Sequence, residues 1–291
     1  MNILLAINSK YLLPAKVLIT SIFENNDVNI NIYLLHSSLN EVEIKELRKV
    51  VEGKYNGKLI DILINEKDFK DFPLSHHFTI ETYYRFLAQS ILPEEVDRIL
   101  WLDADMIVKK SISDFYNQDF EGKYVVVCQS INKNPMEILQ RLELDSTSKY
   151  FNAGTILFNL KDIRKNIKPS IYFEYIRDNK DKIKWLDQDV LNVIFNTSSK
   201  YDDNERYNKQ IFSEHKFNAE QLEYIENNTA IIHYIGAIKP WHYKYENKCK
   251  NYYWRYALIS EGIFHYIRFY SLNYVYTLYK KIKYKFNLGK V

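Results

Sequence analysis

The chain has 291 residues, of which 46% are hydrophobic and 26% charged, a composition that is ordinary for a globular protein and excludes an intrinsically disordered chain. Its formal net charge is only +3, from 40 Lys and Arg against 37 Asp and Glu, so the protein as a whole is not strongly drawn to polyanions such as nucleic acids. The length suffices for one domain with an appendage, and we expect no independent second domain.

Scarce residue types exclude several common kinds of site. The seven glycines form neither the GxGxxG pattern of dinucleotide-binding folds nor the GxxxxGK[ST] pattern of P-loops. The two cysteines, Cys128 and Cys249, cannot build a disulfide framework, a CxxC redox site or a Cys-rich zinc site. The N-terminus has no signal-peptide pattern, and no segment has the roughly 18 uncharged apolar residues of a membrane span, so we expect a cytoplasmic protein.

The first half of the chain alternates strand-like and helical patterns. Short apolar runs predict strands at residues 2–7, 30–35, 58–64 and 98–102. Apolar residues at helical spacing predict helices at residues 12–26, 41–51 and 81–90. A capping box of Asn40 and Glu43 opens the second of these helices. The alternation predicts an α/β fold whose mostly parallel sheet is flanked by helices and binds ligands beyond the carboxyl ends of its strands.

The second half continues the pattern less regularly. Apolar runs predict strands at residues 123–128, 154–159 and 230–234, and helical spacing predicts helices at 171–179 and 187–195. The polar stretch 198–208 is predicted to be a loop. From about Tyr252 the composition becomes aromatic and basic, which is the one candidate boundary. We therefore expect a catalytic domain at 1–250 and a helical tail at 251–291.

Two acids follow a predicted buried strand. Asp103 and Asp105, separated by Ala104, come directly after residues 98–102, so both carboxylates should project into the ligand crevice. Carboxylates beside an apolar strand are costly unless a cation neutralises them. Hard divalent ions such as Mg²⁺ or Mn²⁺ prefer oxygen ligands and commonly bridge protein carboxylates to a diphosphate. An isolated Asp-x-Asp is also a common start of a loop, so this pattern alone leaves both interpretations open.

A second group of polar residues follows the strand at 230–234. His233 ends the apolar run, Gly236 permits close approach of the backbone, and Lys239 offers a positive charge to a diphosphate. An imidazole beside two carboxylates suits Mn²⁺ better than Mg²⁺. His233 viewed alone would also fit a core histidine.

Four motifs in this order resemble glycosyltransferase family 8. They are Asp103-Ala-Asp105, Phe151-Asn-Ala-Gly154, Leu186-Asp-Gln-Asp189 and His233-Tyr-Ile-Gly-Ala-Ile-Lys239 with the following Pro-Trp. The resemblance covers roughly residues 1–245. The family contains retaining transferases, among them bacterial lipopolysaccharide and lipooligosaccharide galactosyl- and glucosyltransferases. The resemblance implies a nucleotide-sugar-binding fold of the GT-A type, a UDP-hexose donor and Mn²⁺, with Mg²⁺ as the alternative ion.

The resemblance also implies a role for individual positions. Asp103, Asp105 and His233 match the family's metal ligands. Several residues match positions at which the family binds the donor. Ala6, Asn8 and Tyr11 match the loop at the uracil and ribose, with Tyr11 stacking on the base, and Asn152, Asp187 and Gln188 match residues around the transferred sugar. Gly236 and Lys239 match contacts with the diphosphate, and the remaining donor-binding positions are Arg85, Asp103, Ala104 and Asp105.

The chain departs from the family at two places. The family often has an acid where this chain has Asn8, so a ribose or uracil contact is made here by a neutral amide or is lost. Close bacterial relatives carry an acid after the strand at 123–128, where this chain has Gln129 and Ser130. These residues therefore bear on how the sugar or the acceptor is recognised, and they do not alter the metal site.

The resemblance and the residues together predict transfer of a hexose from a UDP-sugar to a hydroxyl of a bacterial surface glycan or glycoconjugate, with retention at the anomeric carbon. Gln188 stands where a double displacement would need a carboxylate nucleophile, and an amide is a poor nucleophile. We therefore favour same-face attack by the acceptor, with the Gln188 carbonyl stabilising positive charge and Asp187 holding sugar hydroxyls. A non-catalytic sugar-nucleotide-binding protein and a metal-dependent phosphohydrolase or nucleotidyltransferase are the alternatives.

The last thirty residues concentrate the positive charge. Residues 262–291 hold six basic residues and no acid, which leaves 34 basic against 37 acidic residues in the rest of the chain. Aromatic residues are interleaved with these basic residues, and such a helix is drawn to anionic lipid headgroups. We expect peripheral attachment to the cytoplasmic face of the inner membrane, and the alternative is a helix packed on the body with its lysines in solvent.

Overall fold

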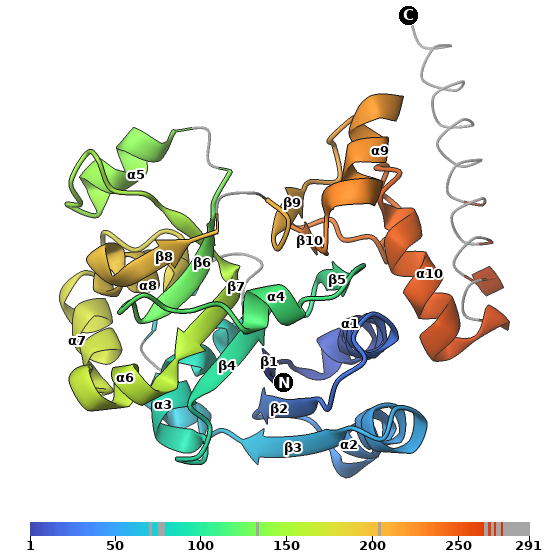
Figure 1. Cartoon of the computed structure of the whole chain (residues 1–291), viewed down its shortest axis with the longest axis horizontal. Helices are drawn as coiled ribbons and strands as arrows, with labels where there is room; N and C mark the ends of the chain where they lie inside the picture. Colours follow the sequence, from blue (N-terminus) through green and yellow to red (C-terminus); the bar gives the residue numbers. More distant parts are fainter. Residues whose placement is uncertain are drawn as a thin grey trace, which may run out of the picture.

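A seven-stranded sheet forms the centre of the molecule, with strands in the order β3-β2-β1-β4-β7-β6-β8 (Figure 1). In chain order these strands are β1 (Asn2–Ala6), β2 (Asn31–His36), β3 (Lys58–Leu63), β4 (Arg98–Leu102), β6 (Val125–Gln129), β7 (Phe151–Asn159) and β8 (Ser199–Tyr201). Strand β7 runs antiparallel to its neighbours β4 and β6, and the other neighbouring pairs are parallel. The expected α/β fold with a mostly parallel sheet is confirmed.

The computed structural model describes residues 1–69, 72–74, 79–131, 134–202, 205–264, 267–268, 271 and 275. Its α-helices are α1 (Leu12–Glu24), α2 (Glu41–Arg48), α3 (Ala88–Ile91), α4 (Ser113–Tyr116), α5 (Pro135–Arg141), α6 (Leu160–Asn166), α7 (Ser170–Asp178), α8 (Leu186–Ile194), α9 (Ala219–Asn228) and α10 (Lys250–Glu261). Short 3₁₀ segments are η1 (Ser9–Tyr11), η3 (Glu66–Phe69), η4 (Ile80–Leu87) and η5 (Asn196–Ser198), and η2 (Lys49–Lys54) is a π-helix.

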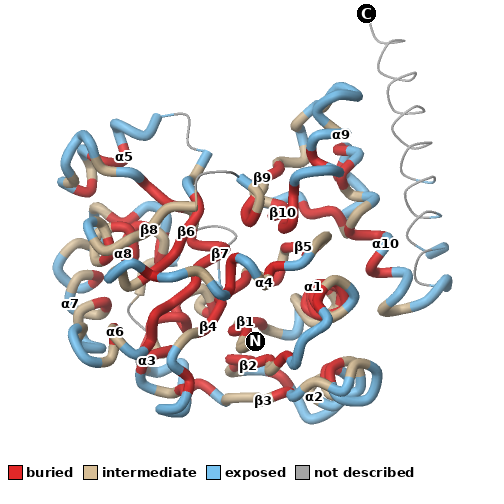
Figure 2. Tube along the Cα trace, viewed as in Figure 1, coloured by how far each residue is buried: buried red, intermediate tan, exposed pale blue. Residues whose placement is uncertain are grey.

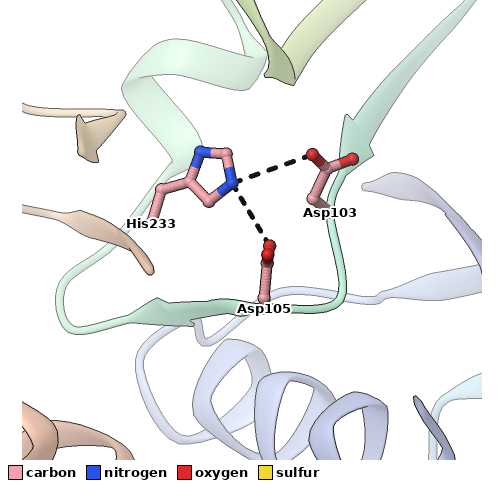
Figure 3. Close-up of side chains that lie close together, drawn as sticks. All are labelled: Asp103, Asp105 and His233. Carbon is pink, nitrogen blue, oxygen red and sulfur yellow. Dashed lines mark ion pairs between the residues drawn. The ribbon is translucent and has the colours of Figure 1, made fainter. Parts of the chain in front are cut away.

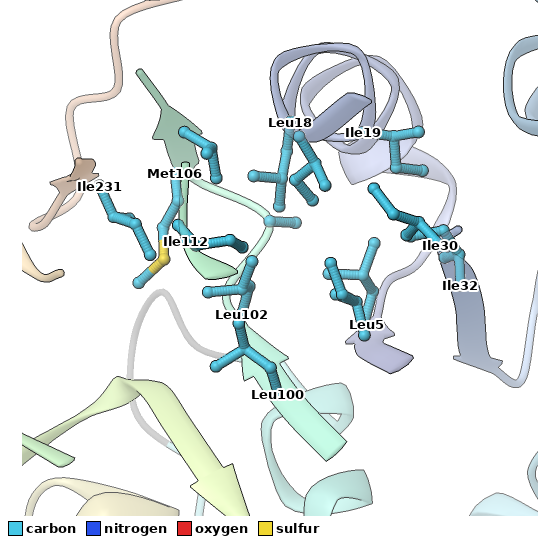
Figure 4. Close-up of a cluster of buried hydrophobic side chains, with 14 of the residues drawn as sticks. Leu5, Leu18, Ile19, Ile30, Ile32, Leu100, Leu102, Met106, Ile112 and Ile231 are labelled. Carbon is cyan, nitrogen blue, oxygen red and sulfur yellow. The ribbon is translucent and has the colours of Figure 1, made fainter. Parts of the chain in front are cut away.

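The sheet separates two hydrophobic cores, because successive side chains of a strand point to opposite faces. In β4, Leu100 and Leu102 join the core beneath α1, whereas Ile99 and Trp101 join the core beneath α6, α7 and α8. Figure 4 shows the first of these cores, and Figure 2 shows that the central strands β1, β4, β6 and β7 are mostly buried while helices α2, α5 and α9 expose much of their surface. A strand buried on both faces is continuously apolar, which is why residues 98–102 could be recognised from the sequence.

A second sheet of three strands lies beside the first, in the order β5-β10-β9. Its strands are β5 (Met106–Val108), β9 (Lys209–Ile211) and β10 (Ile231–Tyr234). Strand β5 follows β4 after three residues, so the chain leaves the large sheet and enters the small one at Asp103–Asp105. The sequence predicted β10, but β5 and β9 have three residues each and are too short to show a period.

Two sequence predictions need correction. The stretch 198–208, predicted as a loop, contains β8, which extends the sheet beside β6. The half-buried Ser, Lys and Tyr of β8 give no apolar signal, and the strand forms because β6 offers a free edge. Residues 81–90 are not one α-helix: the 3₁₀ segment η4 precedes the short helix α3.

The start of the expected tail packs on the body. Buried residues of α10, among them Tyr253 and Trp254, share a core with Val17 of α1 and Ile232 of β10. The helix ends at Glu261, followed by Gly262 at a φ of 80°. The basic residues Lys280, Lys281, Lys283, Lys285 and Lys290 lie outside the described residues. Among the helices that are described, none combines the length and the apolar character needed to cross a bilayer.

Candidate active site

The directions of β1, β4 and β7 bring one end of each strand to the same edge of the large sheet. Strands β1 and β4 end there, and β7 begins there because it runs antiparallel to β4. The pairing continues past the end of β4, where the Asp103 N–H donates to the carbonyl of Gly154 at 3.0 Å. The Phe151–Gly154 motif therefore lies beside Asp103, as expected for ligand-binding residues in an α/β sheet.

The small sheet adds His233 to this edge. In the antiparallel pairing of β10 with β5, His233 stands opposite Met106, and the Tyr234 N–H donates to the Asp105 carbonyl at 3.0 Å. Figure 3 shows the imidazole turned toward both aspartates. Its Nε2 lies 3.2 Å from Asp105 Oδ1 and 3.8 Å from Asp103 Oδ2. The predicted cluster of two carboxylates and one imidazole is present.

The cluster fits a divalent cation. One ligand atom from each of Asp103, Asp105 and His233 can be chosen so that all three lie within 4.8 Å of one another. Asp105 Oδ1 is buried and accepts no hydrogen bond from the described residues, an arrangement that a bound cation would satisfy. Burial acts to raise the pKa of Asp105, but Lys239 and His233 together lower this pKa well below its ordinary value, so the carboxylate is ionised.

Gly154 makes room for the imidazole. A Cβ atom built at this position would lie 2.4 Å from His233 Cε1 and 2.6 Å from the methyl carbon of Met106. Any side chain at residue 154 would therefore push the imidazole away from the two aspartates. The sequence motif contained this glycine, but its reason is steric and becomes visible only when β7 and β10 are placed together.

The buried Arg85 forms ion pairs with both Asp103 and Asp187. Its guanidinium lies 3.0 Å from Asp103 Oδ1 and 3.1 Å from Asp187 Oδ2, and it stacks 4.0 Å from the ring centroid of Trp101. It also donates to the carbonyl of Ala153. The side chain is only 2% exposed, so its charge serves first to hold Asp103 and Asp187 in place.

Asp187 and Gln188 lie in the first turn of helix α8, and both line a cavity beside Asp103. Thr82 donates its hydroxyl to Asp187 Oδ1 at 2.5 Å. Burial raises the pKa of Asp187 to about 6, although Arg85 and Thr82 act in the opposite direction. The Gln188 carbonyl oxygen accepts from Asn152 Nδ2 and from the Ala153 N–H, both at 3.0 Å.

Lys239 is paired with one of the candidate metal ligands. Its Nζ lies 2.5 Å from Asp105 Oδ2 and donates to the Tyr234 carbonyl at 2.7 Å. The preceding Gly236 has a φ of 86°, which glycine adopts without strain and which lets the chain turn back over the aspartates. The expected role at a diphosphate stays a prediction, but the lysine is at the right place for it.

Two adjoining cavities contain all the expected site residues on their walls. The smaller, of about 140 Å³, is lined among others by Ala6, Asn8, Tyr11 and Ala104. The larger, of about 320 Å³, is lined among others by Asn152, Asp187, Gln188 and His233, and also by Ser130. Both share Arg85, Asp103, Asp105, Gly236 and Lys239. The two cavities therefore meet at the aspartates.

The sequence analysis assigned no role to two residues of this site, of which Asp189 belongs to one of the family motifs and Asn208 to none. Asp189 is fully buried and accepts hydrogen bonds from Arg141, from the Tyr150 hydroxyl and from the backbone N–H groups of Lys184 and Trp185. This acid fixes the turn that presents Asp187 and Gln188. Asn208 contacts His233 and lies in a polar stretch without a pattern, so no sequence signal distinguishes it from a loop asparagine.

Comparison with known proteins identifies the family. A family model described as glycosyl transferase family 8 matches residues 2–245. The chain belongs to glycosyl transferase family 8. The lipopolysaccharide 1,2-glucosyltransferase of Escherichia coli is 29% identical over 248 residues, which cover 83% of this chain and 73% of that protein. The lipopolysaccharide 1,3-galactosyltransferase of Salmonella typhimurium is 26% identical over 247 residues, with the same two shares.

A solved structure shows the same fold. Galactosyltransferase LgtC, crystallised with donor and acceptor sugar analogues, superposes with a TM-score of 0.79 and 25% sequence identity over 90% of this chain and 97% of the other. The family 8 resemblance and the GT-A fold are confirmed, and the protein is a hexosyltransferase. The alternative of a non-catalytic binding protein is therefore set aside.

Substitution of Gly154 tests whether the imidazole belongs to a metal site. We expect Gly154→Ala to displace His233 and to weaken Mn²⁺ binding by about 10- to 100-fold, as changes around metal ligands typically do. Mn²⁺ titration followed by electron paramagnetic resonance measures the affinity. Gly53→Ala is the matched control, because a Cβ there meets nothing closer than Lys49 Cγ at 3.9 Å. Equal affinity of both variants would show that His233 is not a ligand.

Asp187 predicts a pH dependence of stability in the metal-free protein. Its pKa of about 6 in the folded state exceeds the ordinary value, so the folded protein keeps a proton that the unfolded chain releases. Between about pH 4 and pH 7 this group should lower the free energy of unfolding by at most about 3 kcal/mol as the pH rises. Asp187→Asn lacks that contribution.

The measurement is urea denaturation of both proteins in EDTA across this pH range. The stability of the wild type relative to Asp187→Asn should fall as the pH rises. A relative stability that is constant or that increases with pH would contradict the raised pKa.

Proposed function

We propose that this hexosyltransferase transfers galactose or glucose from a UDP-sugar to a hydroxyl of a bacterial surface glycan or glycoconjugate, with retention at the anomeric carbon and with Mn²⁺. The convergence of Asp103, Asp105 and His233 at the junction of two cavities carries this proposal. The relatives named above act on lipopolysaccharide, and LgtC was solved with donor and acceptor sugar analogues.

The two cavities suit the two halves of a sugar-nucleotide donor. We assign the smaller cavity to the nucleoside, with Ala6 and Asn8 near the base and ribose and Tyr11 stacked on the base. Tyr11 is held edge-on against Trp241, with ring centroids 5.9 Å apart, so its ring has a fixed orientation. We assign the larger cavity to the transferred hexose, whose hydroxyls would meet Asn152 and Asp187.

The diphosphate would lie between the cavities, beside Asp103 and Asp105. These two acids and His233 would hold Mn²⁺, which the imidazole favours over Mg²⁺ and which would neutralise charge on the diphosphate. Lys239 contributes a second positive charge at the same place, where charge grows on the leaving group. In this proposal Lys239 exchanges its contact with Asp105 for one with the diphosphate.

The contacts of Gln188 favour retention without a covalent intermediate. Its amide is a poor nucleophile, and its oxygen already accepts two hydrogen bonds. The acceptor hydroxyl therefore attacks the anomeric carbon from the face that the diphosphate leaves, and its proton passes to the departing diphosphate oxygen. The fixed dipole of the Gln188 carbonyl stabilises positive charge on the sugar. The half-exposed Trp185 and Ile131 give the larger cavity an apolar rim on which a saccharide acceptor can pack.

Product analysis tests the reaction and its stereochemistry together. We expect Mn²⁺-dependent release of UDP from UDP-galactose or UDP-glucose, faster in the presence of a lipooligosaccharide core acceptor. Proton NMR of the product should show the same anomeric configuration as the donor. Asp105→Ala should lower the rate by at least about 100-fold, since it removes a ligand to the charge-neutralising ion. An inverted product, or full Mn²⁺-dependent turnover in Asp105→Ala, would contradict the mechanism.

We further propose that residues 262–291 attach the enzyme peripherally to the cytoplasmic face of the inner membrane, where a lipid-linked acceptor would be found. The six basic residues support this proposal, because each contributes roughly 1 kcal/mol near an anionic surface. The described residues Ile263, Phe264 and Ile267 are exposed apolar side chains directly after α10.

Vesicle sedimentation tests the tail. The full chain should sediment with vesicles that contain phosphatidylglycerol and much less with vesicles of phosphatidylcholine alone. A chain ending at Gly262 should remain in the supernatant with both, while its activity on a water-soluble acceptor shows that it is folded. Equal sedimentation of the two chains would refute the attachment.

A further inference from the structure

We propose that Asn208 is a positioning residue that holds His233 in the tautomer with its proton on Nδ1, so that the lone pair of Nε2 faces the metal site. This inference deepens the proposed function and rests on its metal site. Asn208 directly precedes β9, and its side chain is buried with only 2% of the residue exposed. It does not line either cavity, so it acts only through its neighbours.

Two backbone N–H groups of strand β7 fix the orientation of the neighbouring side-chain amides. The Ala153 N–H donates to Gln188 Oε1, and the Gly154 N–H donates to Asn152 Oδ1, each at 3.0 Å. A backbone N–H can only donate, so both side-chain amides must present their oxygen to strand β7. The Nδ2 of Asn152 then donates to Gln188 Oε1, also at 3.0 Å, which agrees with both assignments.

Asn152 in turn fixes the orientation of Asn208. The Nδ2 of Asn208 donates to Asn152 Oδ1 at 2.8 Å. The opposite orientation would set two oxygens against each other, because Asn152 Oδ1 cannot donate. The Oδ1 of Asn208 therefore faces His233, where it lies 3.1 Å from Nδ1.

The imidazole meets only acceptors on this side. His233 Nδ1 lies 3.1 Å from Asn208 Oδ1 and 3.1 Å from Asn152 Oδ1. Two acceptors require a donor between them, so Nδ1 carries the proton. On its other side the ring faces the carboxylates of Asp103 and Asp105, so Nε2 also carries a proton whenever the imidazole is charged. In the neutral ring, which is the form that binds a metal, Nε2 has given up its proton and has a free lone pair.

The pairing of the small sheet explains why Asn208 is at this place. Strand β9 runs parallel to β10 with Gln210 beside His233, so the residue before β9 reaches the near side of the imidazole. Histidines that bind metals commonly donate their other N–H to an oxygen, which fixes the ring and its tautomer. Asn208 and Asn152 supply such oxygens before any ion binds.

The direct test is the tautomer of His233 in the metal-free full chain, measured at a pH high enough for the imidazole to be neutral. Long-range ¹H–¹⁵N NMR of ¹⁵N-labelled protein in EDTA distinguishes the two ring nitrogens, and His233→Gln identifies the signals. We expect the Nδ1–H tautomer in the wild type and a substantial Nε2–H population in Asn208→Ala. An Nε2–H tautomer in the wild type, or an unchanged tautomer in folded Asn208→Ala, overturns the proposal.

Metal affinity provides a second measurement. Asn208→Ala should weaken Mn²⁺ binding by about 10- to 100-fold, as measured by electron paramagnetic resonance. The matched control is Asn228→Ala, which removes an exposed asparagine at the end of α9 whose amide donates, among the described residues, to the Tyr224 carbonyl. This variant should bind Mn²⁺ like the wild type.

These outcomes separate this inference from the proposed function. The tautomer is measured without metal, donor or acceptor, so failure of sugar transfer with the expected tautomer refutes the function alone. Normal transfer with an Nε2–H tautomer refutes only the role of Asn208. If Asn208→Ala does not fold, the wild-type tautomer still decides the question.

Discussion

The site depends on the register in which β10 pairs with β5. The chain leaves the large sheet at Asp103, passes Asp105 and enters the small sheet at Met106, and the antiparallel pairing sets His233 opposite Met106. A shift by one residue would turn the imidazole to the other face of the small sheet. Backbone hydrogen bonds at this one junction thus join a histidine to two aspartates that are far away in the sequence, and Gly154 leaves the space that the ring occupies.

Burial of so many charges has a cost that the surrounding residues offset. Arg85 lies between Asp103 and Asp187, and Lys239 pairs with Asp105, so each acid has a cation before any ligand binds. Leu186, the first residue of α8, has a φ of 48°, an uncommon value for a branched side chain, and Asp189 accepts hydrogen bonds from the N–H groups of the two residues before Leu186. The strained Leu186 and these buried charges lie where the substrate is proposed to bind, as is common for enzymes.

The sequence was informative where a segment is buried on both faces or carries several spaced motifs. The apolar run of β4 and the acids after it predicted both the strand and the site, and the family motifs gave the fold. It was uninformative where structure depends on partners distant in the chain. The three-residue strands β5, β8 and β9 form only against a neighbouring edge. The role of Asp189 shows only when Arg141 and Tyr150 lie beside it, and the role of Asn208 only when His233 does.

Anomalous diffraction from crystals grown with Mn²⁺ tests the central claim most directly. The register of β10 on β5 predicts one strong peak at the edge of the large sheet, bonded to carboxylate oxygens of Asp103 and Asp105 and to Nε2 of His233. Coordination through Nδ1, or a peak that contacts the aspartates without His233, would contradict the claim that the pairing of these two strands builds the metal site.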